Sequence, residues 1–109
     1  MVGYELYKTR YPIKVFPEKP SSENEESESS GELYEVRIID NDYNTYEEVM
    51  EICMTALGIT RAEAYAIAWE VDHVGSCVVA LGSLDEAESV AQIIRTIGID
   101  VQVNPVRIH

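Results

Sequence analysis

The chain has 109 residues, of which 46% are hydrophobic and 26% are charged, a composition typical of one small domain with an apolar core. Its net charge of -12 disfavours nucleic acid and anionic membrane surfaces as partners. The sequence has no apolar run of about 20 residues and no secretion signal, so neither a membrane span nor export is predicted.

Residues 1–32 are predicted to form an N-terminal extension outside the folded domain. Within it, residues 18–32 are acidic and lack any aliphatic or aromatic side chain, so they should be mostly disordered. Residues 1–17 are more apolar and contain several tyrosines. Three interpretations of this part stay open: a flexible arm, an added strand, or a docking segment for another protein.

Residues 33–109 carry clear signals for strands and helices. Apolar, β-branched runs predict strands at 33–40, 76–81 and 99–103. Each expected helix begins with a capping box, which is a Thr or Ser followed three residues later by Glu, and each is stopped by glycine. The boxes start at Thr45, Thr60 and Ser83, and the glycines are Gly58, Gly75 and Gly98.

The resulting order, β-α-α-β-α-β, predicts a compact α+β domain. Its economical form is a three-stranded antiparallel sheet with the helices packed on one face. Cys53 and Cys77 both fall inside apolar patterns, so we interpret them as free core thiols of a cytoplasmic protein rather than as a disulfide.

The row Asp40-Asn41-Asp42 ends the first strand, and Asp40, Asp42, Asn44 and Glu51 have the spacing of positions 1, 3, 5 and 12 of a calcium loop. In an EF-hand, however, a glycine is required where this chain has Thr45, and a helix precedes the loop where this chain has a strand. No nucleophile motif, phosphate loop or metal cluster accompanies the carboxylates. We therefore predict no enzymatic activity, no catalytic residue, no metal and no cofactor.

Helix capping explains only part of this row. Asn44 or Thr45 can cap the first helix, and Asp42 can favour the positive N-terminal end of that helix. Asp40 and Asn41 come too early in the chain to cap anything. We interpret their side chains as aimed at a ligand.

The segments "YEVRIIDNDYNTYEEVMEIC" and "TRAEAYAIAWEVDHVGSCVVALGSLDEAESVAQII", followed by a closing strand, resemble the ClpS adaptor family. The resemblance covers residues 33–106. It implies the fold shared with the C-terminal domain of the bacterial ribosomal stalk protein. The implied function is to bind proteins with a bulky hydrophobic N-terminal residue (N-degrons) and to deliver them to a Clp-type ATPase–protease. A disordered N-terminal extension that the ATPase engages is typical of the family.

The resemblance also implies site residues. The family's Asn-Asp-Asp falls on Asp40-Asn41-Asp42, and its Val-His-x-x-Gly turn falls on "VDHVG", where Asp72 replaces the histidine and His73 follows. Asp40, Asn41 and Asp72 would then accept hydrogen bonds from the α-ammonium of the bound protein, which has donors only. Asp42 and His73 would lie near this site.

The same alignment implies a hydrophobic pocket for the first side chain and a surface for the ATPase. Asp85 matches an acidic residue of the ATPase-facing surface. Ala68 stands where the family often has methionine. The implied pocket consists of Thr45, Tyr46, Val49, Ala68, Val71 and Val101.

The expected partners are N-degron proteins and the N-terminal domain of a Clp-family AAA+ ATPase, with the adaptor itself a monomer. The alternative is a non-enzymatic interaction module of the same fold, similar to the ribosomal stalk domain, that does not read N-termini. Convergence of Asp40, Asn41 and Asp72 would distinguish these two hypotheses, because a stalk-type module does not need it.

Overall fold

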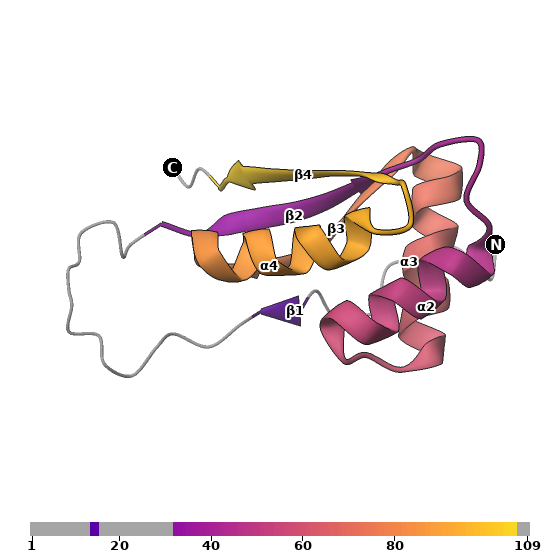
Figure 1. Ribbon diagram of the computed structural model, residues 1–109, viewed down its shortest axis with the longest axis horizontal. Helices are drawn as coiled ribbons and strands as arrows, with labels where there is room; N and C mark the ends of the chain where they lie inside the picture. Colours follow the sequence, from indigo (N-terminus) through magenta and orange to yellow (C-terminus); the bar gives the residue numbers. More distant parts are fainter. Residues whose placement is uncertain (1–13, 16–31, 107–109) are drawn as a thin grey trace, which may run out of the picture.

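The computed structural model describes residues 14–15 and 32–106 of the chain (Figure 1). The predicted disorder of residues 18–31 and the role of most of residues 1–17 lie outside the described part. The described elements are β1 (Lys14–Val15), β2 (Tyr34–Ile39), α2 (Tyr46–Leu57), α3 (Arg61–Val74), β3 (Ser76–Gly82), α4 (Leu84–Arg95) and β4 (Asp100–Pro105).

The sheet has the strand order β1-β3-β2-β4. The central strand β2 pairs antiparallel with both neighbours, so that Ile38 lies opposite Cys77 of β3 and Val101 of β4. This antiparallel sheet of three strands and the α+β class confirm the prediction. The two-residue strand β1 adds a short parallel pairing at the outer edge of β3, which selects the added-strand interpretation for residues 14–15.

The three helices begin where their capping boxes predict. Thr45, Thr60 and Ser83 each accept a hydrogen bond from the backbone three residues on, and the glutamate at that position bonds back to the cap. Gly58 and Gly75 end α2 and α3 in the left-handed conformation. The third helix, α4, ends at Arg95, before the predicted stop, because Gly98 instead closes a turn by donating to the Arg95 carbonyl at 2.9 Å.

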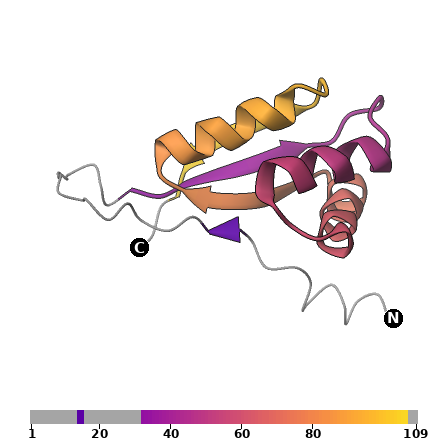
Figure 2. The same ribbon diagram turned by 60° about the horizontal axis from the view of Figure 1, so that its bottom comes forward.

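The helices cover the sheet in two ways (Figure 2). Helix α4 lies along one face of the sheet and contacts β2, β3 and β4, while α2 and α3 pack against each other at one end of it. All of these elements contribute to a single buried cluster. Both cysteines are buried in it, as predicted. Burial, with a smaller contribution from Cys77, raises the pKa of Cys53 to about 12.

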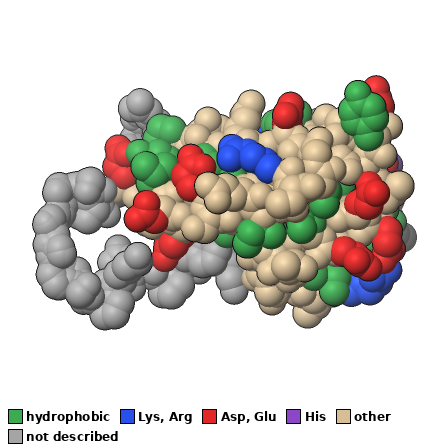
Figure 3. All heavy atoms as spheres, in the orientation of Figure 1, with side chains coloured by type: hydrophobic (Ala, Val, Ile, Leu, Met, Phe, Trp, Pro, Cys, Tyr) green, Lys and Arg blue, Asp and Glu red, His purple; other side chains and the backbone are tan. Residues whose placement is uncertain are grey.

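The described surface reflects the acidic composition. Figure 3 shows acidic side chains spread over one face of the molecule, with fewer basic ones among them. No helix in the described ranges is both long and apolar enough to cross a membrane.

Candidate functional site

The site is built where β2 ends beside the end of α3. The backbone N–H of Asp40 donates to the carbonyl of Gly75 at 3.0 Å, and Gly75 is the residue that terminates α3. This bond holds Asp40 near the last turn of α3, which carries Asp72. The chain then turns from Asp40 through Thr45 into α2.

A network centred on Asn41 and Asn44 fixes this turn. The Oδ1 atom of Asn41 accepts hydrogen bonds from the backbone N–H groups of Tyr43 (3.1 Å) and Asn44 (3.0 Å). The Nδ2 atom of Asn41 donates to Oδ1 of Asn44 at 2.8 Å. Asn44 in turn donates to the carbonyl of Ile97 at 2.9 Å, which ties the loop to the segment leading into β4.

This network gives Asn41 a role in the loop that the sequence analysis did not include. Its side-chain oxygen, which we expected to receive an ammonium group, already accepts two backbone donors. Such a bond from an Asn oxygen to backbone two and three residues on is how this residue type stabilises tight turns. The structure therefore uses Asn41 to position the loop.

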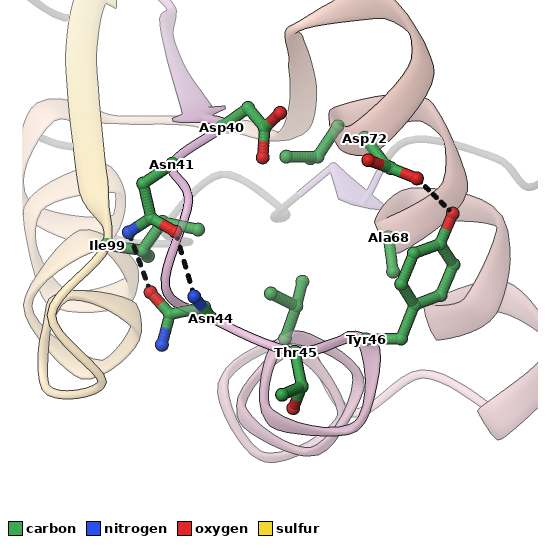
Figure 4. A pocket seen from close by; sticks show the side chains of 10 residues that line it. Asp40, Asn41, Asn44, Thr45, Tyr46, Ala68, Asp72 and Ile99 are labelled. Atoms are coloured by element: carbon green, nitrogen blue, oxygen red, sulfur yellow. Dashed lines mark hydrogen bonds between the residues drawn. The ribbon is translucent and has the colours of Figure 1, made fainter.

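Tyr46 connects the two helices across the site. Its hydroxyl donates to Oδ2 of Asp72 at 2.9 Å (Figure 4). The centroid of its ring lies 5.7 Å from that of Tyr65. Partial burial, the bond to Asp72 and the nearby negative charges of Asp72 and Asp40 raise the pKa of Tyr46 to about 12. Tyr46 therefore stays a neutral donor at neutral pH and holds one oxygen of Asp72.

A cavity of about 120 Å³ opens between these groups. Figure 4 shows the carboxylates of Asp40 and Asp72 toward the same side of the cavity, with Ala68 near the ring of Tyr46. Its apolar wall comes from α2, α3 and the residue before β4. The lining residues are Asp40, Asn41, Asn44, Thr45, Tyr46, Val49, Ala68, Val71, Asp72 and Ile99.

Eight of the sequence-predicted residues are thus brought together around one cavity. Val101 is the predicted pocket residue that does not line this cavity. In the strand register it lies opposite Ile38, inside the core, and is 6% exposed. Ile99, two residues earlier, is level with the end of β2 and takes its place on the cavity wall.

Asp42 and His73 do not line the cavity. Asp42 is exposed on the loop. His73 points along the outside of α3, where its ring stacks on that of Trp69 at 4.1 Å and its Nδ1 lies 3.0 Å from the Trp69 carbonyl oxygen. Asp85 is exposed in the first turn of α4, away from the lining residues.

Sequence reasoning missed two lining residues, Asn44 and Ile99. Asn44 was considered only as a possible helix cap, whereas Thr45 is the cap and Asn44 bonds to the chain 53 residues away. Ile99 carries the same alternating apolar signal as Val101. Only the register of β2 against β4 distinguishes them.

The acidic residues of the cavity were also considered as metal ligands. Within residues 14–15 and 32–106, no group of three or more His, Cys, Asp or Glu side chains is placed to hold a metal ion. The strand β2 precedes Asp40, which agrees with the argument against an EF-hand. The arrangement instead offers two carboxylates beside an apolar hollow, which suits a ligand with a cationic group next to a hydrophobic one.

Comparison with known proteins agrees with this architecture. The chain is similar to the solved structure of Agrobacterium tumefaciens ClpS2 bound to L-phenylalaninamide, with 21% sequence identity and a TM-score of 0.66. That similarity covers 69% of this chain and 98% of the other and shows the shared fold. A search of curated protein sequences gave no match. The family model described as "ATP-dependent Clp protease adaptor protein ClpS" matches residues 29–106, most of the chain, and the protein therefore belongs to the ClpS adaptor family.

Proposed function

We propose that this protein binds the free N-terminus of proteins whose first residue is bulky and hydrophobic, and delivers them to a Clp-family AAA+ ATPase and its protease. The observation that carries the proposal is the pair Asp40 and Asp72 at the border of an apolar cavity. Membership of the ClpS family supports the adaptor role.

The carboxylates suit the α-ammonium group of the bound protein. An ammonium has three donors and no acceptor, and a carboxylate can accept at about four positions. The Tyr46 hydroxyl occupies one of the positions on Asp72. Asp40 and the other positions on Asp72 can form charge-assisted hydrogen bonds, which are roughly twice as strong as neutral ones.

The cavity suits the first side chain. It measures about 120 Å³, and in another protein an apolar cavity of about 150 Å³ binds benzene. Val49, Ala68, Val71 and Ile99 supply an apolar wall. The related ClpS2 structure holds L-phenylalaninamide, a ligand with a free α-amine and a benzyl side chain, which supports an aromatic ligand in this chain as well.

Delivery requires a second surface. Asp85 is exposed in the first turn of α4 and lies outside the cavity lining, so a bound substrate leaves it accessible. We place contact with the N-terminal domain of the ATPase at this surface. The N-terminal extension would then be available for the ATPase to engage.

The test is fluorescence anisotropy with labelled peptides that begin with Phe and differ only in acetylation of the α-amine. Acetylation removes the charge and leaves carboxylates without their donor, which typically costs about 1–3 kcal/mol. We expect affinity to fall by a factor between about 5 and about 140. Asp72→Asn should weaken binding of the free peptide similarly, while Asp42→Asn, on the same loop but outside the lining, should not.

Equal binding of free and acetylated peptides would contradict the proposal. It would favour the alternative, an interaction module similar to the ribosomal stalk domain that binds a folded protein surface. If affinity for the free peptide falls with Asp42→Asn but not with Asp72→Asn, the protein still recognises N-termini, but the binding site lies on the outer part of the loop.

A further inference from the structure

The side chain of Asp72 is only partly packed, although it borders the cavity. It is 52% exposed, so the surrounding atoms leave its carboxylate room to rotate about the side-chain bonds. Asp72 is nevertheless one of the two carboxylates at the cavity border, and the other, Asp40, comes from the loop after β2. The group that orients Asp72 therefore determines which of its oxygens faces a ligand.

One oxygen of Asp72 is held by Tyr46. The Tyr46 hydroxyl donates to Oδ2 at 2.9 Å, and Figure 4 shows the other oxygen of Asp72 on the side of Asp40. The Nδ1 atom of His73 lies 3.6 Å from the same Oδ2 atom, which is too far for a hydrogen bond, and 3.0 Å from the Trp69 carbonyl oxygen. The hydrogen bond from Tyr46 thus fixes Oδ2 and leaves Oδ1 toward Asp40.

The role of Asn41 makes this orientation more important for binding. The side-chain oxygen of Asn41 accepts two backbone N–H groups, which uses both of its lone pairs. The proposed function accordingly assigns the α-ammonium group to Asp40 and Asp72. A carboxylate that is already held in the binding orientation does not have to be ordered when the ligand arrives, and this increases affinity.

We propose that Tyr46 is a positioning residue for amine recognition: its hydroxyl orients Asp72 so that Oδ1 receives the α-ammonium group of the bound protein. The inference rests on the proposed function and adds to it a residue that does not itself contact the amine. Tyr46 acts from the first turn of α2 on a carboxylate in the last turn of α3, across the cavity.

The test measures, by fluorescence anisotropy, the dissociation constants of two Phe-initiated peptides, one with a free and one with an acetylated α-amine. We call the ratio of the two constants the acetylation penalty. It reports amine recognition, because both peptides carry the same side chains. A loss of stability alone reduces binding of both peptides by the same factor and leaves the penalty unchanged.

Tyr46→Phe keeps the ring and removes the hydroxyl that bonds to Asp72. We expect this variant to reduce the acetylation penalty about fivefold. That change corresponds to about 1 kcal/mol, a typical net contribution of one hydrogen bond.

Tyr65→Phe is the matched control. The ring centroids of Tyr65 and Tyr46 lie 5.7 Å apart, so this variant removes a hydroxyl from the same aromatic pair and keeps the bond to Asp72. The acetylation penalty should stay at the value of the unmodified protein. A second comparison uses Asp72→Ala, in which no carboxylate is left to orient. Adding Tyr46→Phe to Asp72→Ala should change the penalty no further.

The positioning role is wrong if Tyr46→Phe leaves the acetylation penalty unchanged, whatever it does to the affinity for both peptides. It is also wrong if Tyr46→Phe reduces the penalty equally with and without Asp72→Ala, because Tyr46 would then act on the amine independently of Asp72. Failure of the proposed function gives a different result: the unmodified protein itself would show no acetylation penalty, and this inference would fall with it.

Discussion

Tyr46 joins the first turn of α2 to the last turn of α3, and its hydroxyl is the donor of that link. The pKa of this group is raised to about 12, so the folded protein keeps the proton more tightly than the unfolded chain, in which the pKa is 10.0. Below pH 10 both states are protonated and the stabilisation is complete. As the pH rises from 10 toward 12, only the unfolded state loses the proton, and stability falls.

We therefore expect Tyr46→Phe to lower stability at pH 8 and to weaken the loss of stability between pH 10 and 12. Urea unfolding midpoints measured across this range test the expectation. Tyr34→Phe is the matched control, because the pKa of Tyr34 is also raised, by its hydrogen bond to Glu32, but Tyr34 lies outside the cavity lining. If the unfolding midpoint of Tyr46→Phe falls between pH 10 and 12 as steeply as that of the unmodified protein, the hydrogen bond to Asp72 does not hold the proton.

Ala68 determines how much room the cavity leaves for a ligand. It is 3% exposed and lies in the wall near Tyr46, whose ring is held at the border by Asp72 instead of filling the hollow. Under the proposed function, aromatic first residues should bind more tightly than Leu, by about 0.8 kcal/mol for each additional CH₂-sized group that is buried.

Ala68→Met should fill this space and reverse the order toward Leu-initiated peptides. Anisotropy titrations with peptides that begin with Phe, Trp or Leu measure the order in both proteins. Ala62→Met, at an exposed position of the same helix, should leave the order unchanged. Tighter binding of Leu than of Phe by the unmodified protein would show that the cavity is smaller for a side chain than its volume suggests.

At the scale of elements, the features that could be predicted from the sequence were those set by residues close together in the chain. A capping box involves residues three apart, and a C-terminal glycine acts on its own helix, so the starts of the three helices and the ends of α2 and α3 followed from the sequence. The link from Asn44 to Ile97 joins residues 53 apart, and no local pattern contains it. The exchange of Val101 for Ile99 has the same cause, because strand register is a property of two segments.

Thr45 has a local role and a role in the site: it caps α2, and it lines the cavity. Loss of such a cap typically costs about 1 kcal/mol. We expect Thr45→Ala to lower the free energy of unfolding by about this amount and also to weaken peptide binding. Thr60→Ala removes the equivalent cap of α3, outside the cavity, and should lower stability similarly with binding intact. Calorimetry and anisotropy on the pair separate the two effects, and equal loss of binding in both variants would contradict the local role of Thr45.

At the scale of the whole molecule, we expect different segments of the chain to carry different functions. Within residues 14–15 and 32–106, the cavity-lining residues lie between Asp40 and Ile99, and the core cluster is drawn from β2 to β4. The strand β1 adds only two residues to the sheet edge. Recognition is therefore expected to reside in residues 33–109, while the extension is left for delivery. The extension could not be assigned further from sequence, because its acidic part lacks the apolar periodicity from which structure is predicted.

Deletion of residues 1–32 should therefore leave a cooperatively folded domain with peptide affinity close to that of the full chain. It should abolish degradation of a Phe-initiated reporter by the Clp ATPase–protease, because the extension is the part we expect the ATPase to engage. A second variant replaces residues 18–31 by a Gly/Ser linker of equal length and retains residues 1–17. It tests whether degradation requires only the length of this segment or also its acidic sequence. Loss of the cooperative melt on deletion would contradict this division and show that β1 and its neighbours are part of the core, since removal of two edge residues alone should cost the sheet little.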